Sequence, residues 1–68
     1  MRDWLIALRN EQKRSAAEIA KELDVSPAYY SMIERGKRQK KMDITLVAKL
    51  AQIFGVSVET IISKEDMN

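Results

Sequence analysis

The densest group of charged side chains in this sequence is a basic run near the middle of the chain. Residues 35–41 carry five basic side chains and no acidic one, namely Arg35, Lys37, Arg38, Lys40 and Lys41. Outside this window the chain has 7 basic and 10 acidic residues, a net charge of −3, whereas the whole chain has +2. A basic patch on a mildly acidic body is suited to binding phosphate backbones. A solvated lysine-rich loop has the same composition, so charge alone leaves both interpretations open.

Catalytic and metal chemistry have few candidate residues here, because the sequence contains no histidine and no cysteine. Disulfide bonds and the common zinc sites are therefore excluded, as is the usual general base near neutral pH. Carboxylates could still act as bases, but no group of residues resembles a known catalytic constellation. We expect a protein that is not an enzyme and that has no metal, no cofactor and no small-molecule ligand.

Composition indicates one globular domain. The chain has 68 residues, of which 46% are apolar and 32% charged, and we treat residues 1–68 as a single domain. No apolar run approaches the roughly 18 residues of a membrane span, and no signal-peptide core follows Arg2 and Asp3. We therefore expect a cytoplasmic protein.

Helices should dominate, because the chain has only one proline and two glycines. A first helix from about residue 2 to 12 is predicted by apolar residues at helical spacing, Trp4, Leu5 and Leu8. The sequence SAAE at 15–18 is a capping box, in which the Ser15 side chain accepts an amide hydrogen bond and Glu18 reaches back. It predicts a second helix that ends near residue 22 or 23.

Three further helices follow from cap signals. Ser26 and Pro27 begin a third helix that runs to about residue 35 and ends at Gly36. Asp43 caps a fourth helix that ends at Gly55, with a buried side predicted to consist of Ile44, Val47, Leu50, Ala51 and Phe54. Ser57 caps a short fifth helix, and we expect the chain to fray from about residue 64 to 68.

The second and third helices are separated by only about three residues, Asp24 to Ser26. So tight a turn makes the helices cross steeply, which requires a small residue at Ala20. It also requires apolar residues in the angle between the helices, and these are Ile19, Leu23, Val25, Tyr30 and Ile33. The turn itself needs a positive φ, for which Asp24 is tolerated although glycine is preferred. The sequence meets each of these requirements.

The stretch SAAEIAKELDVSPAYYSMIERGKR resembles the helix-turn-helix of the Cro and phage-repressor type, the XRE family. The resemblance extends through LVAKLAQIFGVSVETII and covers about residues 4 to 62, and IERGK is its most specific part. It implies an all-α fold, a compact five-helix bundle of the lambda-repressor-like DNA-binding type, with the helix-turn-helix at about residues 16–35. Members of this family mostly bind operator DNA as dimers, and they are typical of bacteria and phages.

The resemblance also assigns roles to residues of the first and third helices. It implies a structural salt bridge between Arg9 and Glu34. It places base contacts on the third helix at Pro27, Ala28, Tyr29, Ser31 and Met32, whereas Tyr30 points inward. Only Ser31 and Tyr29 of this set offer hydrogen bonds, so contact by shape and with the C5-methyl group of thymine is expected to dominate.

Phosphate contacts are expected on both sides of that helix. They comprise Lys13, Arg14 and Ser15 before the second helix, and Arg35, Lys37, Arg38, Lys40 and Lys41 after the third. Ala16 stands where family members often have a phosphate-contacting glutamine, and Lys13 and Arg14 can replace that contact with charge. Apolar residues near the C-terminus, Val58, Ile61, Ile62 and also Met67, are candidates for a dimer interface, although some of them could complete the core instead.

Two functions remain open at this point. The favoured one is a sequence-specific, double-stranded DNA-binding transcriptional regulator, a repressor, that binds a palindromic operator as a homodimer. The alternative keeps the fold but is a protein-interaction module, such as an antitoxin or a co-regulator. The tyrosines and the methionine of PAYYSM suit that alternative, because such side chains also occur at protein interfaces. The basic run favours the first function.

Overall fold

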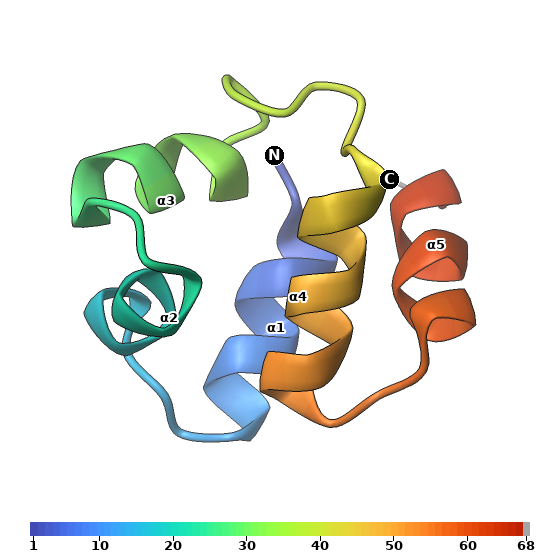
Figure 1. The fold of residues 1–68 in the computed structure, drawn as a ribbon, viewed down its shortest axis with the longest axis horizontal. Coiled ribbons are helices and arrows are strands. Elements are labelled where there is room, and N and C mark those ends of the chain that lie inside the picture. The colour runs from blue at the N-terminus through green and yellow to red at the C-terminus, as the bar shows by residue number, and fades with distance from the viewer. Residues whose placement is uncertain (68) are drawn as a thin grey trace.

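A computed structural model describes residues 1–67 and contains five helices. Figure 1 shows their arrangement. In chain order they are α1 (Asp3–Glu11), α2 (Ala16–Leu23), α3 (Pro27–Glu34), α4 (Ile44–Phe54) and α5 (Val58–Asp66). The longest connection is the segment between α3 and α4, residues 35–43, which contains the whole basic run.

Most of the helices begin where the sequence predicts a cap. In α2, α3, α4 and α5 the residue before the helix accepts a hydrogen bond from the backbone amide three positions on, and these caps are Ser15, Ser26, Asp43 and Ser57. Each cap satisfies one of the amides that a helix start leaves without a partner. By contrast, α1 begins after Arg2 without a side-chain cap.

Three helices end in a left-handed residue. Asp24 follows α2 with φ 61°, Gly36 follows α3 with φ 75°, and Gly55 follows α4 with φ 69°. At the end of α3 the Gly36 amide donates to the Ile33 carbonyl at 3.1 Å, and the Lys37 amide donates to the Met32 carbonyl at 2.9 Å. This pair of bonds is a Schellman motif, which ends a helix and redirects the chain.

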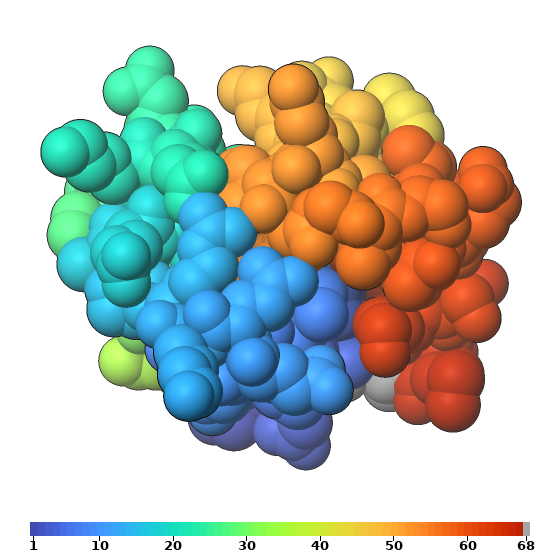
Figure 2. Space-filling model, turned by 90° about the horizontal axis from the view of Figure 1, so that it is seen from below, coloured from blue at the N-terminus to red at the C-terminus, as the bar shows by residue number. Residues whose placement is uncertain are grey.

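Helices α2, α3 and α5 lie on two sides of α1 and α4. Figure 1 shows α2 and α3 on one side and α5 on the other, and the basic run crosses from α3 to α4 above the N-terminus. The main packing partners are α2 with α3 and α4 with α5, while α2 also packs on α4 and α1 on α3. In the view from below, residues of α1 and the following turn fill the space between these two sides (Figure 2).

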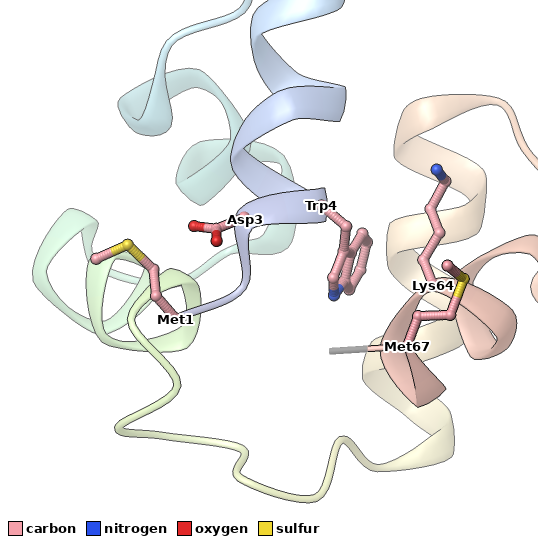
Figure 3. A pocket seen from close by; sticks show the side chains of 5 residues that line it. All are labelled: Met1, Asp3, Trp4, Lys64 and Met67. Carbon is pink, nitrogen blue, oxygen red and sulfur yellow. The ribbon is translucent and has the colours of Figure 1, made fainter.

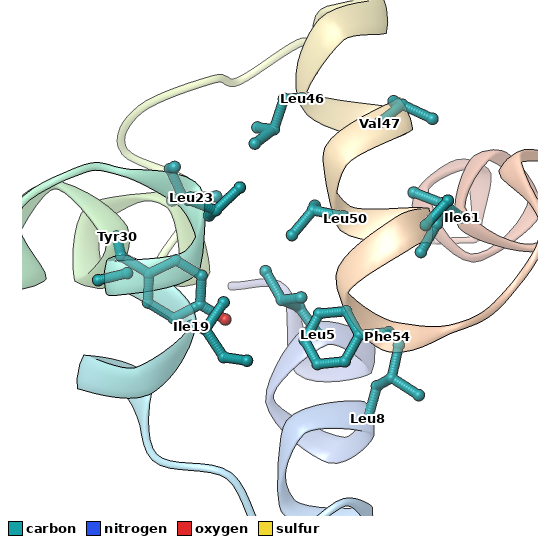
Figure 4. Packing of buried hydrophobic residues seen from close by; sticks show 13 residues of the cluster. Leu5, Leu8, Ile19, Leu23, Tyr30, Leu46, Val47, Leu50, Phe54 and Ile61 are labelled. Atoms are coloured by element: carbon teal, nitrogen blue, oxygen red, sulfur yellow. The ribbon is translucent and has the colours of Figure 1, made fainter.

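Side chains from all five helices form a single core (Figure 4). Its members are Leu5, Leu8, Ile19, Ala20, Leu23, Tyr30, Ile33, Leu46, Val47, Leu50, Ala51, Phe54 and Ile61. The small and apolar positions predicted for the steep α2–α3 crossing are buried, except that Val25 is only partly buried.

The predicted buried side of α4 was wrong at one position. Ile44 is 68% exposed and Leu46 is buried in its place. Leu46, Val47, Leu50, Ala51 and Phe54 are the buried residues of this helix. Ile44 has helical spacing to Val47 and Ala51, but it is the first residue of the helix and lies before the buried stretch, so spacing alone did not reveal its exposure.

The predicted fraying from about residue 64 was also wrong for the residues that can be compared. Helix α5 continues to Asp66, while position 68 lies outside the described residues. The helix persists because Glu65 accepts hydrogen bonds from Arg2 and Trp4, which belong to the other end of the chain. A contact of this kind has no local signal in the sequence.

The all-α fold class is confirmed, since residues 1–67 contain helices and no strand. Within that range no single helix is both long and apolar enough to cross a membrane. Only α4 and α5 taken together reach the required length and composition, and they are bent by 115° at their junction.

The left-handed turn between α2 and α3 gives a first prediction. Replacing Asp24 by glycine should raise the free energy of unfolding by about 1 kcal/mol, because glycine adopts this conformation without the steric cost that a Cβ atom brings. Thermal or urea unfolding of the Asp24→Gly variant measures the change.

Gly55 provides the matched control for that measurement. It has a similar φ, and a Cβ atom built there meets no other atom within 4 Å. Gly55→Ala should therefore lose about 1 kcal/mol for conformational reasons alone. An Asp24→Gly variant less stable than the original chain would contradict the assignment of strain to this turn.

Candidate nucleic-acid interface

Helix α3 is fastened to the rest of the protein along one side. Tyr30, Ile33 and Glu34 are its buried residues. Its opposite side contains Pro27, Ala28, Ser31 and Met32, of which Ser31 is half-buried and the others are exposed. Arg35 follows three residues after Met32 and so extends this outer side toward the basic run. The predicted base-contacting positions therefore share one accessible side of α3, with Tyr29 at its margin.

Tyr29 is less accessible than the other predicted base contacts. Its ring is half-buried against the core, and its hydroxyl accepts a hydrogen bond from the Gln39 side-chain amide at 3.2 Å. The carbonyl oxygen of the same Gln39 side chain accepts from the Asp43 amide at 3.2 Å. Gln39 thus joins α3 to the start of α4. The Tyr29 hydroxyl still has its own proton to donate.

An ion pair between Arg9 of α1 and Glu34 joins the C-terminal end of α3 to α1. Arg9 Nε lies 2.7 Å from Glu34 Oε2, and both side chains are largely buried. The hydrogen bond to the Glu34 carboxylate raises the pKa of Arg9, which keeps the guanidinium charged. Breaking a buried pair leaves the remaining charge without compensation, which is costly. The pair therefore resists any movement of α3 relative to α1.

The hydroxyl of Tyr30 lies beside this ion pair. The residue is fully buried, and among the described residues the hydroxyl has no hydrogen bond of normal geometry. Burial raises the pKa of Tyr30, and the negative charge of Glu34 raises it further. Tyr30 is therefore uncharged and contributes to packing, in agreement with its inward-pointing position in the resemblance.

The basic run presents all of its charged side chains to solvent. Arg35, Lys37, Arg38, Lys40 and Lys41 are exposed. None of them forms an ion pair within residues 1–67, where the ion pairs involve Arg2, Arg9 and Arg14. Five positive charges are thus available to an external anion.

The backbone of this run is held from inside by Arg2, a residue for which no role was predicted. Arg2 is 1% exposed, and its guanidinium donates to the carbonyl oxygens of Arg38, Gln39 and Lys40. The conformation of the segment is also fixed by Gln39, which is left-handed with φ 53°. A charged residue next to the first methionine gave no signal of burial, because its partners are more than 30 residues away in the sequence.

Of the three phosphate contacts predicted before α2, two are accessible to a ligand. Lys13 is exposed. Ser15 is also exposed, and its hydroxyl accepts from the Glu18 amide at 3.1 Å, which leaves the hydroxyl proton free for an acceptor. The turn therefore offers one charge and one hydrogen-bond donor near the start of α2.

Arg14, the third predicted phosphate contact, is occupied within the protein. Its guanidinium donates to the Ile53 carbonyl at 2.7 Å, forms a salt bridge with Glu22 and lies over the ring of Phe54, 5.9 Å from the centroid. Arg14 therefore joins the start of α2 to the end of α4. Because its guanidinium is already bound within the protein, Arg14 is not available to a phosphate, whereas the neighbouring Lys13 is exposed.

The predicted dimer residues divide between core and surface. Ile61 is fully buried in the core, so its assignment to a dimer interface is corrected. Val58 is partly buried against the core, whereas Ile62 is 42% exposed and Met67 is 84% exposed. Near Met67 a hollow opens between the N-terminal residues and α5. Figure 3 shows the side chains that line it, Met1, Asp3, Trp4, Lys64 and Met67.

The chain is similar to known helix-turn-helix proteins. The profile of the family described as helix-turn-helix matches residues 5–61. The HTH-type transcriptional regulator RamB of Mycobacterium tuberculosis, in the strains CDC 1551 and H37Rv, is 32% identical over 59 residues. These residues are 87% of this chain but only 12% of RamB, so the chain spans about one eighth of these relatives. No solved structure shows a significant match.

The capping box at the start of α2 gives a second prediction. The hydrogen bond from the Ser15 backbone amide to the Glu18 carboxylate, at 2.7 Å, lowers the pKa of Glu18 from its ordinary value of 4.5. A carboxylate whose pKa is lowered by folding stabilises the protein above the unfolded pKa, and this stabilisation is lost as pH falls through the folded pKa. Glu18→Gln should therefore lower the melting temperature at pH 7, and the difference should vanish as the pH falls well below 4.5.

The control for this measurement is Glu11→Gln. Glu11 is also exposed, but it lies at the end of α1 and makes no side-chain hydrogen bond among residues 1–67. Glu11→Gln therefore removes one exposed carboxylate without disturbing a helix cap, and its pH dependence is the reference for that of Glu18→Gln. Equal pH dependence for Glu18→Gln and the original chain would show that the capping box contributes nothing through its charge.

Proposed function

Because the chain belongs to the helix-turn-helix family, we propose that it is a sequence-specific, double-stranded DNA-binding transcriptional regulator. One observation carries the proposal, namely that the accessible side of α3 leads directly into five exposed basic side chains that form no ion pair with any of residues 1–67. The name of RamB, an HTH-type transcriptional regulator, supports the same function. We propose repression as its action, since a domain that occupies an operator excludes other proteins from it.

In the proposed complex α3 lies in the major groove. An α-helix fits this groove, and in helix-turn-helix proteins the N-terminal residues of the second helix contact base edges while the first helix crosses the backbone. Pro27, Ala28, Ser31 and Met32 then face the bases. Ser31 supplies a hydrogen bond, and Ala28 and Met32 supply apolar contact suited to the methyl group of thymine.

Phosphates on both sides of the groove would bind the remaining polar groups. Lys13 and Ser15 serve one strand near the start of α2, and the basic run serves the backbone beyond the end of α3. Such contacts fix the position of the helix and add affinity with little sequence information. They also make binding depend on salt, because each phosphate that is neutralised releases bound cations.

We further propose that the protein binds a palindromic operator as a homodimer. A helix of eight residues reaches few base pairs, so proteins of this kind pair across half-sites about one helical turn, roughly 34 Å, apart. Two of the predicted dimer residues remain exposed, Ile62 at 42% and Met67 at 84%, and Val58 lies one turn before Ile62 on α5.

A protein-interaction module is the second candidate. The observation in its favour is that α3 offers few hydrogen-bonding groups on its accessible side and that Met32 is 37% exposed there. A module of this kind has no need of five unpaired basic side chains next to the same helix. Salt dependence on DNA distinguishes the two functions.

Site selection from random duplex DNA provides the principal test. A palindromic sequence should be enriched, and a plot of log affinity against log salt should have a slope on the order of −4 to −5 per subunit, one phosphate for each side chain of the basic run. No enriched sequence, together with affinity independent of salt, would refute the proposal and leave the protein-interaction module.

Two groups of variants should then differ in kind. The double variant Lys37→Ala and Arg38→Ala should weaken binding to all sequences alike and reduce the salt slope by about 2. Met32→Ala or Ser31→Ala should leave the slope unchanged and alter the preference at one operator position by about 1 kcal/mol. Binding to an operator series at several salt concentrations measures both quantities, and equal effects from the two groups would contradict this division of roles.

A further inference from the structure

We propose that Arg2 is a positioning residue for DNA binding, which holds the basic run in the conformation that meets phosphates. The inference rests on the proposed function, and it assigns a role to a side chain that does not itself face the DNA. Arg2 is 1% exposed, yet it carries a full positive charge and five N–H donors. A buried arginine with so many partners requires an explanation.

The guanidinium group binds the backbone of the basic run directly. Its Nη1 donates to the Arg38 carbonyl at 3.2 Å, and its Nη2 donates to the carbonyls of Gln39 and Lys40. Three consecutive residues outside any helix are thus fastened to one planar group. The side chains of Arg38 and Lys40, together with the following Lys41, are exposed. Fixing the backbone inside fixes where these charges project outside.

The same group connects this segment to the end of α3. Nη1 also donates to the Ile33 carbonyl at 2.6 Å, and the Arg2 backbone amide donates to the Glu34 carbonyl at 2.7 Å. These carbonyls belong to the last turn of α3, where a cation is favourable. One residue therefore fixes the position of the phosphate-contacting segment relative to the base-contacting helix.

Glu65 of α5 holds the guanidinium itself in place. Its carboxylate accepts from Arg2 Nε at 3.0 Å and from Nη2 at 2.8 Å, and Trp4 Nε1 donates to it at 3.1 Å. The Glu65 side chain is 20% exposed. Arginine suits this arrangement because its donors form a rigid planar fork, whereas a lysine ammonium is a single point charge.

The hydrogen bonds from Arg2 oppose the electrostatic repulsion within the basic run. Five like charges in seven residues repel one another, so an unsupported segment would spread in solution. An ordered segment loses less conformational entropy when it binds. Arg35 and Lys37 depend less on Arg2, since the Schellman motif at the end of α3 already fixes their backbone. Arg2 therefore positions three of the five charges, those of Arg38, Lys40 and Lys41.

The test uses a short random-sequence DNA duplex, because non-specific binding reports the phosphate contacts alone. Arg2→Lys should remain folded, keep the net charge and reduce the salt slope by about 2 to 3 per subunit. Backbone NMR relaxation should show greater motion at residues 38–41 and not in α4.

Arg9→Lys is the matched control, because Arg9 forms a comparable ion pair but makes no hydrogen bond to the basic run. It should lower stability and leave the slope unchanged.

Glu65→Gln decides the question if Arg2→Lys does not fold. Removing a negative charge should by itself strengthen DNA binding, and Glu59→Gln on the same helix is expected to do so slightly. Loss of the anchoring carboxylate should instead weaken binding and reduce the slope by about 1. A Glu65→Gln variant that binds as tightly as Glu59→Gln, or a folded Arg2→Lys variant with the original slope, would overturn the inference. An original chain without salt-dependent binding would instead refute the proposed function.

Discussion

The structure depends most on how the C-terminal end of α3 is anchored. Two arginines from the beginning of the chain converge there, Arg9 on the Glu34 carboxylate and Arg2 on the last carbonyls of the helix. A chain of 68 residues has a small core. Charged hydrogen bonds in partly buried positions give the orientation of one short helix a precision that apolar packing alone does not. The proposed base contacts of α3 rely on that orientation.

Local features of the fold could be predicted from the sequence, because their causes lie within a few residues. Serine and aspartate caps, the capping box of α2 and the left-handed residues at 24, 36 and 55 all involve partners at most six positions away. The small residue Ala20 at the steep crossing is another case, since the length of the turn sets the requirement. These features define the helix-turn-helix almost completely.

The tertiary roles of charged residues could not be predicted in the same way. Arg2, Lys13 and Arg14 are alike in sequence terms, yet Arg2 is buried, Lys13 is exposed and Arg14 is bound to Ile53 and Glu22. The partners that bind Arg14 and Arg2 lie between 8 and 63 positions away in the sequence. The wrong expectations for Ile44 and the end of α5 have the same origin, because exposure at a helix end depends on which neighbour the fold brings there.

The bond between Arg2 and Glu65 has a consequence for how the molecule opens. The last turn of a terminal helix commonly unwinds alone, at a small cost in free energy. Here its unwinding would leave a buried guanidinium without its counter-charge, a penalty that belongs to the interior rather than to the helix end. Unwinding of α5 and release of the segment at 38–40 should therefore be one cooperative event. We therefore expect α5 and residues 38–40 to form a single unit of local unfolding, although Lys40 and Glu65 are 25 positions apart in the sequence.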